Sequence, residues 1–311
     1  MEAPALHALG SNHADSSSAM EAKLTPYWPA YGTVRIDWPQ LLILGGFILL
    51  LYGQICIKLV SDWYVLPDFS HGFLVPFFVL FIVWEKRRVL LGTPRVPSWV
   101  GISLVVVALF TLLLGIYGAE LFFSRISLVL LLAGIVWTLY GIAILREVRF
   151  AFFVLCLGIP IPAVIFNQIT FPLQLMASRA ASAVLPLLGV PVLQQGNVIQ
   201  LASMQLEVAE ACSGIRSLLS LFTVAVLYGY LTEKTNRNRV ILALASIPIA
   251  VLANMARITG TGLCVQYWDP EKALGFFHEF SGWLMFIVSL ACLELVRRTL
   301  TWTQAKKEQQ T

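Results

Sequence analysis

The chain has 311 residues, of which 58% are hydrophobic and 12% are charged, and its formal net charge is +4. Soluble domains carry about 25% charged residues, so this composition excludes a water-soluble body of this size. Windows of roughly 19 residues find about eight segments that are apolar enough to cross a bilayer. The sequence therefore predicts an all-α polytopic membrane protein.

The chain begins with a polar, irregular segment, and we expect residues 1–39 to form a disordered cytoplasmic tail. This tail lacks the basic region, short apolar core and cleavage site of a signal peptide, so the first apolar run is expected to be a retained span. Residues 40–298 are predicted to form the transmembrane domain, and residues 299–311 a second cytoplasmic tail. The predicted spans are residues 40–60, 71–84, 98–118, 122–145, 148–166, 213–231, 240–258 and 280–296.

The longest stretch between spans, about residues 167–211, is predicted to form a small external cap. Its first part, FNQITFPLQLMASRAASAVLPLLG, is typical of an interfacial or partly re-entrant amphipathic helix. Its second part has a turn signal at Gly196 and Asn197 and an alternating run from Met204 to Val208, which predicts two or three short β-strands. Open strand edges cannot lie in hydrocarbon, so we expect the strands to lie above the lipid.

Lysine and arginine gather in the predicted loops on one side of the membrane, whereas acidic residues show no such bias. Examples are Lys86, Arg87 and Arg88 after the second span and Arg297 and Arg298 after the last one. Cytoplasmic loops of membrane proteins are enriched in these basic residues. We therefore expect both termini to be cytoplasmic.

This orientation places a group of ionisable side chains at the outer ends of four different helices. The group comprises His71, Cys212, Arg216, Arg257 and His278. Ionisable groups at the membrane edge are costly and usually face a bundle interior, where they pair or act. The sequence therefore predicts that these residues form one site.

The segment EACSGIRSL carries Cys212 to the start of a spanning helix. The positive end of a helix dipole favours the thiolate, which is the nucleophilic form of cysteine. Arg216, four residues later, could add positive potential or pair with Glu210. The alternative is that Cys212 is a small packing residue, as free cysteines often are.

Arg257 ends the seventh predicted span in ANMARITGTG, with Asn254 one turn earlier. A guanidinium suits a developing oxyanion or a carboxylate, although an interfacial arginine can also snorkel to the lipid surface. His278 opens the eighth span in FFHEFSGW and could relay a proton, or could contact lipid headgroups instead.

The segment PDFSHGFLVPF leads Asp68 and His71 into the second span. Asp68 or Ser70 could cap this helix. For His71, a substrate-binding or structural role is favoured over a direct catalytic one. Asp68, His71, Glu210, Arg216 and Asn254 are therefore candidates for substrate-binding or supporting residues.

Four motifs together resemble the exosortase/archaeosortase family of membrane cysteine transpeptidases. EVAEACSGIRSL is similar to the family's cysteine motif, ANMARI to its Asn-x-x-Arg motif, HEFSG to its His-x-x-x-Gly motif and SHGFLVP to its early His-Gly segment. The histidine in the third motif resembles the bacterial exosortase branch. The resemblance implies Cys212 as nucleophile, Arg257 as stabiliser of the oxyanion or substrate carbonyl, and His278 as acid and base.

The resemblance also implies the substrate class. Family members cleave exported, membrane-anchored proteins at a C-terminal sorting signal, a Pro-Glu-Pro-type motif followed by a spanning helix and basic residues. Cleavage is expected at the outer face of a bacterial inner membrane, with transfer of the acyl group to an unknown cell-surface acceptor. The bilayer and such substrates are the expected partners, and no nucleic acid is expected. No metal cluster or phosphate loop is recognised, so no cofactor is predicted.

Two other function classes stay open from the residues alone. A small multi-pass transporter would place its charged groups near the membrane midplane, whereas here the central portions of the helices are apolar. A cell-envelope acyl or glycosyl transferase would usually need carboxylates or histidines for acid and base chemistry, and nothing in that class requires the Cys–Arg–His set.

Overall fold

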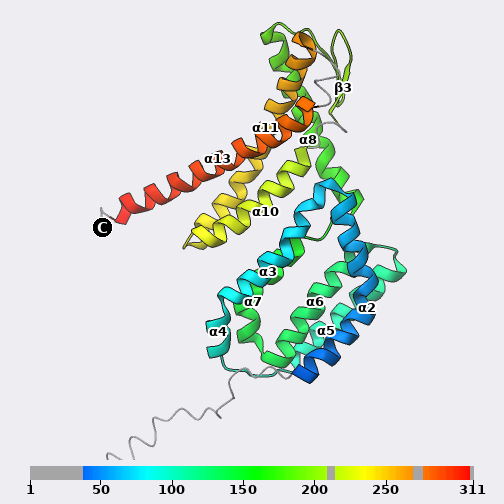
Figure 1. Ribbon diagram of the computed structural model, residues 1–311, viewed down its shortest axis with the longest axis vertical. Helices are drawn as coiled ribbons and strands as arrows, with labels where there is room; N and C mark the ends of the chain where they lie inside the picture. Colours follow the sequence, from blue (N-terminus) through cyan, green and yellow to red (C-terminus); the bar gives the residue numbers. More distant parts are fainter. Residues whose placement is uncertain (1–37, 209–213, 269–275, 309–311) are drawn as a thin grey trace, which may run out of the picture.

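The computed structural model describes residues 38–208, 214–268 and 276–308. These residues are almost entirely helical, with one small three-stranded sheet (Figure 1). Within them, eight helices are long and apolar enough to cross a membrane. The prediction of an all-α polytopic membrane protein with a small β-containing cap is therefore confirmed.

The N-terminal half forms one bundle of helices. Tyr52 of α2, Ala108 of α5 and Leu131 of α6 share a buried core, since their side chains fill the space where these three helices meet. The elements of this half are α2 (Trp38–Val65), η1 (Pro67–Phe73), α3 (Leu74–Glu85), α4 (Arg87–Gly92), α5 (Val100–Tyr117), α6 (Leu121–Tyr140) and α7 (Ile142–Leu157).

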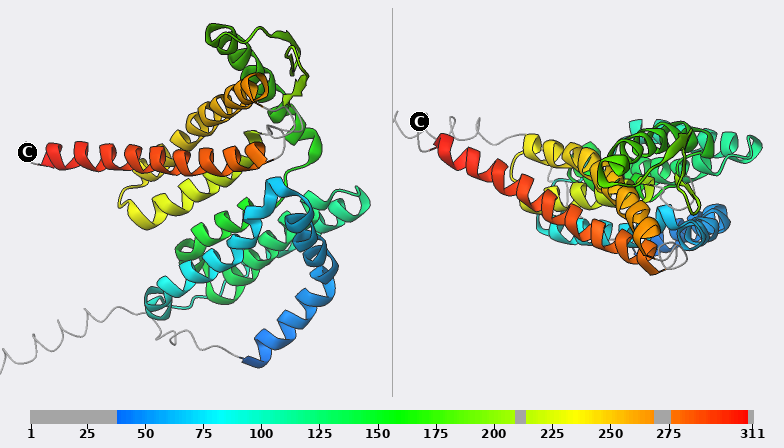
Figure 2. Two further views of the ribbon diagram at one scale, coloured as in Figure 1. Left: turned by 45° about the horizontal axis from the view of Figure 1, so that its top comes forward. Right: turned by 90° about the horizontal axis from the view of Figure 1, so that it is seen from above.

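The C-terminal half adds a second group of helices beside this bundle, as Figure 2 shows. Leu221, Leu242 and Leu293 form the buried core of the three long helices α10, α11 and α13. Leu227 and Tyr230 of α10 pack against α3 and α7 and so join the two groups. The elements of this half are α8 (Ala163–Val184), η2 (Leu185–Leu188), β1 (Leu193–Gln195), β2 (Val198–Gln200), β3 (Gln205–Glu207), α10 (Gly214–Thr232), α11 (Asn236–Tyr267) and α13 (Phe276–Glu308).

The predicted boundaries of two spans, residues 122–145 and 148–166, are wrong. Helix α6 ends at Tyr140, and Gly141 follows with a φ of 92°, a conformation that glycine adopts easily. Helix α7 ends at Leu157, and the next residues read GIPIP before α8 begins. Proline has no backbone N–H to continue a helix, so this segment separates α7 from α8. The candidate membrane span in this part of the chain is Ala163–Leu188, which comprises α8 and η2. Helix α7 packs beside α3 through Val154.

The cap lies at the far end of α11 and contains the predicted strands (Figure 1). The strands pair antiparallel in the order β1-β2-β3, and Gly196, with a φ of 65°, makes the first turn, as predicted. In β3 the buried Leu206 alternates with exposed neighbours, which confirms the pattern seen in the sequence. Leu185, Ile199 and Ile258 bury the sheet against η2 and α11.

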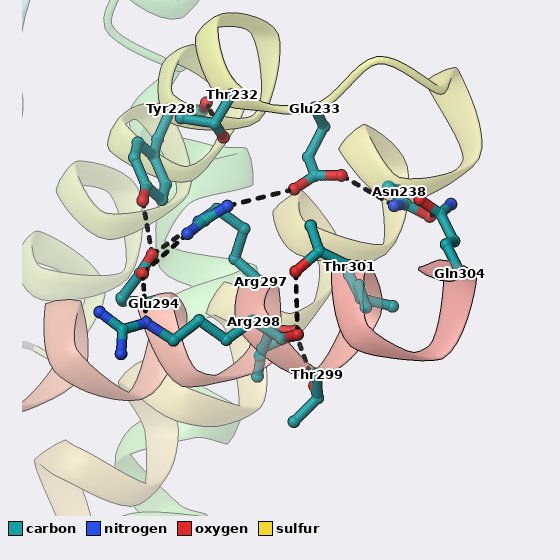
Figure 3. Close-up of polar contacts among 12 residues, drawn as sticks. Tyr228, Thr232, Glu233, Asn238, Glu294, Arg297, Arg298, Thr299, Thr301 and Gln304 are labelled. Carbon is teal, nitrogen blue, oxygen red and sulfur yellow. Dashed lines mark hydrogen bonds and ion pairs between the residues drawn. The ribbon is translucent and has the colours of Figure 1, made fainter. Parts of the chain in front are cut away.

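A network of polar side chains joins α10, α11 and α13 at the opposite end (Figure 3). Glu294 accepts a 2.5 Å hydrogen bond from the Tyr228 hydroxyl and two hydrogen bonds from Arg297, at 2.7 and 2.9 Å. The buried Glu233 accepts a 2.8 Å hydrogen bond from Asn238 and lies 4.0 Å from Arg297. We call this network the polar clamp; its members are Tyr228, Glu233, Asn238, Glu294, Arg297 and Gln304.

Candidate active site

A pocket of about 480 Å³ opens at the end of α10 that lies away from the polar clamp. Residues from η1, α10, α11 and α13 line it, so four segments far apart in the sequence meet there. Two of the predicted site residues, Arg216 and Arg257, are among them. We call this space the arginine pocket; its lining residues are Ser70, Arg216, Ser217, Ser220, Arg257, Gly282, Trp283 and Phe286.

Arg216 lies in the first turn of α10 and pairs with Asp68 of η1. The Nε atom of Arg216 is 3.4 Å from Oδ1 of Asp68, and the arginine side chain is 54% exposed. Glu210, the partner that the sequence suggested, lies outside the described residues. The structure therefore brings together two of the predicted supporting residues through a contact between distant parts of the chain.

The start of α10 is fixed against α11 by a contact that only glycine permits. A Cβ atom added at Gly214 would lie 2.6 Å from Nδ2 of Asn254, closer than side chains approach one another. Asn254 is buried and lies one turn before Arg257. The Cys-x-Gly and Asn-x-x-Arg motifs are therefore in direct contact.

Cys212 lies outside the described residues, but the chain limits its position. Two residues span at most about 7 Å, so its Cα atom lies within that distance of Gly214. Gly214 itself contacts Asn254, so the described part of the cysteine motif begins against the Asn-x-x-Arg motif.

Arg257 lies against the backbone of α13. A Cβ atom added at Gly282 would lie 3.5 Å from Cζ of Arg257, which is ordinary van der Waals contact. His278 is four residues earlier, one turn before Gly282 in the helical backbone of α13, and its side chain is not described. The Asn-x-x-Arg motif therefore contacts the His-x-x-x-Gly motif as well.

His71 is buried next to this region and does not line the arginine pocket. Its Nε2 donates to the Leu157 carbonyl at 3.2 Å, and Trp63 Nε1 donates to the Gly158 carbonyl at 2.6 Å. The indole of Trp63 also occupies the space that a Cβ atom at Gly72 would need. The SHG segment thus ties η1 to α2 and to the end of α7, which supports the structural interpretation of His71.

Several residues of this region were not singled out from the sequence. Ser220 follows Arg216 by four residues on the same face of α10, so helical spacing alone could have identified it. No sequence signal identifies Trp283 and Phe286, because an aromatic residue that lines a pocket has the same local pattern as one that faces lipid. Arg125, another cation on the predicted outer side, is buried and pairs with Asp62 at 2.6 Å.

The comparisons with known proteins agree with the motif assignment. A family model described as Transmembrane exosortase (Exosortase_EpsH) matches residues 63–295. No match was found among curated proteins or among solved structures. The matched region holds all four motifs and every residue that lines the arginine pocket. The chain therefore belongs to the transmembrane exosortase family.

Proposed function

We propose that this exosortase is a cysteine-dependent protease and transpeptidase that cleaves C-terminal sorting signals of the Pro-Glu-Pro type. The observation that carries the proposal is the pair of glycine contacts. Gly214 packs on Asn254 and Gly282 packs on Arg257, and one pocket is lined by Arg216, Arg257 and Gly282, which come from three different motifs. This convergence is what a reaction on a single peptide bond requires.

The proposed reaction has four steps. The Cys212 thiolate attacks a backbone carbonyl carbon of the signal, and the guanidinium of Arg257 stabilises the oxyanion. His278 protonates the leaving amine as the peptide C–N bond breaks, which leaves a thioester on Cys212. A nucleophile of the cell-surface acceptor, deprotonated by His278, then attacks the thioester and releases the thiolate.

The dimensions of α11 support a site at one face of the membrane. From Asn236 near the polar clamp to Arg257 at the arginine pocket, α11 rises about 30 Å, which is the usual thickness of the hydrocarbon core. A solute transporter would instead concentrate its charged groups near the midplane. These dimensions support a position of the arginine pocket at the membrane surface, where we expect a membrane-anchored substrate to emerge from the lipid.

The distribution of basic residues supports placing the pocket on the outer side. Arg297 belongs to the polar clamp and Arg239 donates to the Glu233 carbonyl, and Tyr230 at the same end of α10 stacks on Phe150 in the middle of α7. Lys86 pairs with Glu147 of the same α7 region. By the positive-inside rule this end faces the cytoplasm of a bacterial inner membrane, with both termini on that side.

Replacement of Cys212 tests the proposed function. We expect Cys212→Ala and Cys212→Ser to abolish maturation of a co-expressed, exported reporter that ends in a Pro-Glu-Pro signal, an apolar helix and basic residues. Cys292→Ala, which removes an exposed thiol elsewhere on α13, is the matched control and is expected to process normally. Normal maturation by Cys212→Ala membranes with an equal amount of enzyme contradicts the proposal.

A further inference from the structure

We propose that Arg216 binds an acidic side chain of the substrate segment and makes the arginine pocket selective for a carboxylate near the cleaved bond. This inference rests on the proposed function. It assigns Arg216 a specificity role, separate from the oxyanion role proposed for Arg257.

The first argument is the availability of the Arg216 guanidinium. Its contact with Asp68 is a single one, through Nε at 3.4 Å, and within the described residues no other hydrogen bond reaches it. By contrast, Arg297 of the polar clamp makes contacts of 2.7 and 2.9 Å with Glu294 and is only 23% exposed. A guanidinium has five N–H donors, so the terminal amino groups of Arg216 can bind a second carboxylate.

The second argument is the charge of the pocket. Two guanidinium groups, those of Arg216 and Arg257, line it, and no acidic residue is among its described lining residues. Asp68 contacts Arg216 but is not one of the residues that line the pocket. Arg216 lines the pocket and its side chain is 54% exposed, so a carboxylate that enters the pocket can reach the Arg216 guanidinium and is attracted to it.

The third argument is the character of the remaining walls. Ser70, Ser217 and Ser220 offer hydroxyl groups, while Trp283 and Phe286 offer apolar surface on the α13 side. A volume of about 480 Å³ is within the usual range for ligand pockets. These walls suit an extended peptide that carries one acidic residue and continues into an apolar membrane span.

The chain itself limits where the acidic residue lies relative to the cleaved bond. Cys212 precedes Arg216 by four residues, so their Cα atoms are at most about 14 Å apart. An extended peptide advances about 3.5 Å per residue, so a carboxylate held by Arg216 belongs to a residue within about four positions of the carbonyl that Cys212 attacks.

A reporter library tests this assignment. Each reporter carries an exported domain, a sorting signal, an apolar helix and a basic tail. The signal is randomised at its central Glu and at the four positions on either side of it. Sequencing of mature and precursor forms gives, at each position, the ratio of processing for Glu over Gln. The ratio is measured in the wild-type chain and in the Arg216→Gln, Arg216→Lys, Arg298→Gln and Cys212→Ala variants.

We expect the wild-type chain to prefer Glu over Gln by about tenfold or more at one position, since charged partners discriminate strongly. Arg216→Gln should bring this ratio close to one, and Arg216→Lys should leave it at an intermediate value. Arg298→Gln, at the other end of the molecule, should keep the wild-type ratio. Because the readout is a ratio, it does not depend on how much enzyme folds.

Two outcomes overturn the inference alone: a wild-type chain that processes Glu and Gln signals equally, or an acid preference that persists in Arg216→Gln. The second outcome includes an Arg216→Gln variant that slows Glu and Gln signals by the same factor, because the pocket would then serve the acceptor or the fold. Processing that persists in Cys212→Ala, or a wild-type chain that processes no library member, overturns the proposed function itself.

Discussion

The group formed by helices α10, α11 and α13 carries arginines at both of its ends, and these arginines differ in pairing and in exposure. At the polar clamp, Arg297 is held by two short contacts to Glu294 and approaches the buried Glu233 (Figure 3). At the arginine pocket, Arg216 has one longer contact with Asp68 and is mostly exposed. The clamp pairs its arginine with carboxylates and so joins helices, whereas Arg216 keeps more than half of its side chain exposed.

The sharpest way to test this difference is to remove an arginine at each end. We expect Arg257→Gln to lower the rate of signal processing by about 10²–10³-fold, because it removes a donor to the oxyanion. Arg257→Lys should be nearly as slow, since lysine keeps the charge without the planar fork. The measurement is the rate of reporter maturation per amount of membrane-inserted enzyme.

The matched control is Arg298→Gln, whose side chain is 73% exposed and pairs only along its own helix with Glu294. This variant should mature the reporter at a rate within about twofold of wild type, because exposed pairs of this kind contribute little. Equal losses in Arg257→Gln and Arg298→Gln would show that the two ends do not differ in function.

The glycine contacts give a second, smaller effect at the pocket. Gly214→Ala puts a Cβ atom 2.6 Å from the Asn254 amide, so α10 or Asn254 must move. Because displacements of about 1 Å at a catalytic site can cost up to 10²-fold, we expect processing to fall about 10- to 100-fold. The measurement is again the maturation rate per inserted enzyme.

Substitutions at two other glycines are controls for the effect of the added Cβ atom. Gly282→Ala places its Cβ atom 3.5 Å from Arg257, which is a normal contact, so the expected loss is smaller than for Gly214→Ala. At Gly260 no atom lies within 4 Å of the added Cβ, so Gly260→Ala should process like wild type. A reversed order, with Gly214→Ala the least affected, contradicts the proposed packing of the motifs.

The smallest effect on the reaction is expected at the polar clamp. Glu294→Ala removes the acceptor of hydrogen bonds from Tyr228, Arg297 and Arg298. We expect it to destabilise the fold by about 1–3 kcal/mol, because charged partners lose their acceptor. The measurement is the thermal unfolding temperature in detergent.

Processing per folded Glu294→Ala molecule should stay close to wild type, since the clamp lies a membrane thickness from the pocket. A variant that unfolds at the wild-type temperature but loses processing would mean that the clamp takes part in the reaction. Arg298→Gln again serves as the control, with a shift in unfolding temperature smaller than that of Glu294→Ala.

Composition and local pattern were sufficient to predict most of the fold. Apolar runs of about 20 residues predicted a polytopic helical protein, and the Gly196 turn and the alternation around Leu206 predicted the strands of the cap. The boundaries near residues 141 and 158–162 were wrong, because the window average counted the apolar residues around Gly141 and Pro160 and gave too little weight to helix breakers.

The partners of the site residues could not be predicted in the same way. Asp68 and Arg216 are 148 positions apart, and only packing of η1 on α10 shows that they pair. The Gly214–Asn254 contact likewise depends on how closely α10 and α11 approach. Local sequence shows which residues carry chemistry, whereas tertiary packing decides which of them meet.

The central claim is that sulfur at Cys212 takes up the acyl part of the substrate beside Arg257. The most direct measurement is mass spectrometry of enzyme quenched in acid during turnover of the reporter. We predict a thioester that joins Cys212 to the reporter residue preceding the cleaved bond, sensitive to hydroxylamine and absent from Cys212→Ala. An acyl group found on another residue, or maturation that proceeds in Cys212→Ala, would contradict the account.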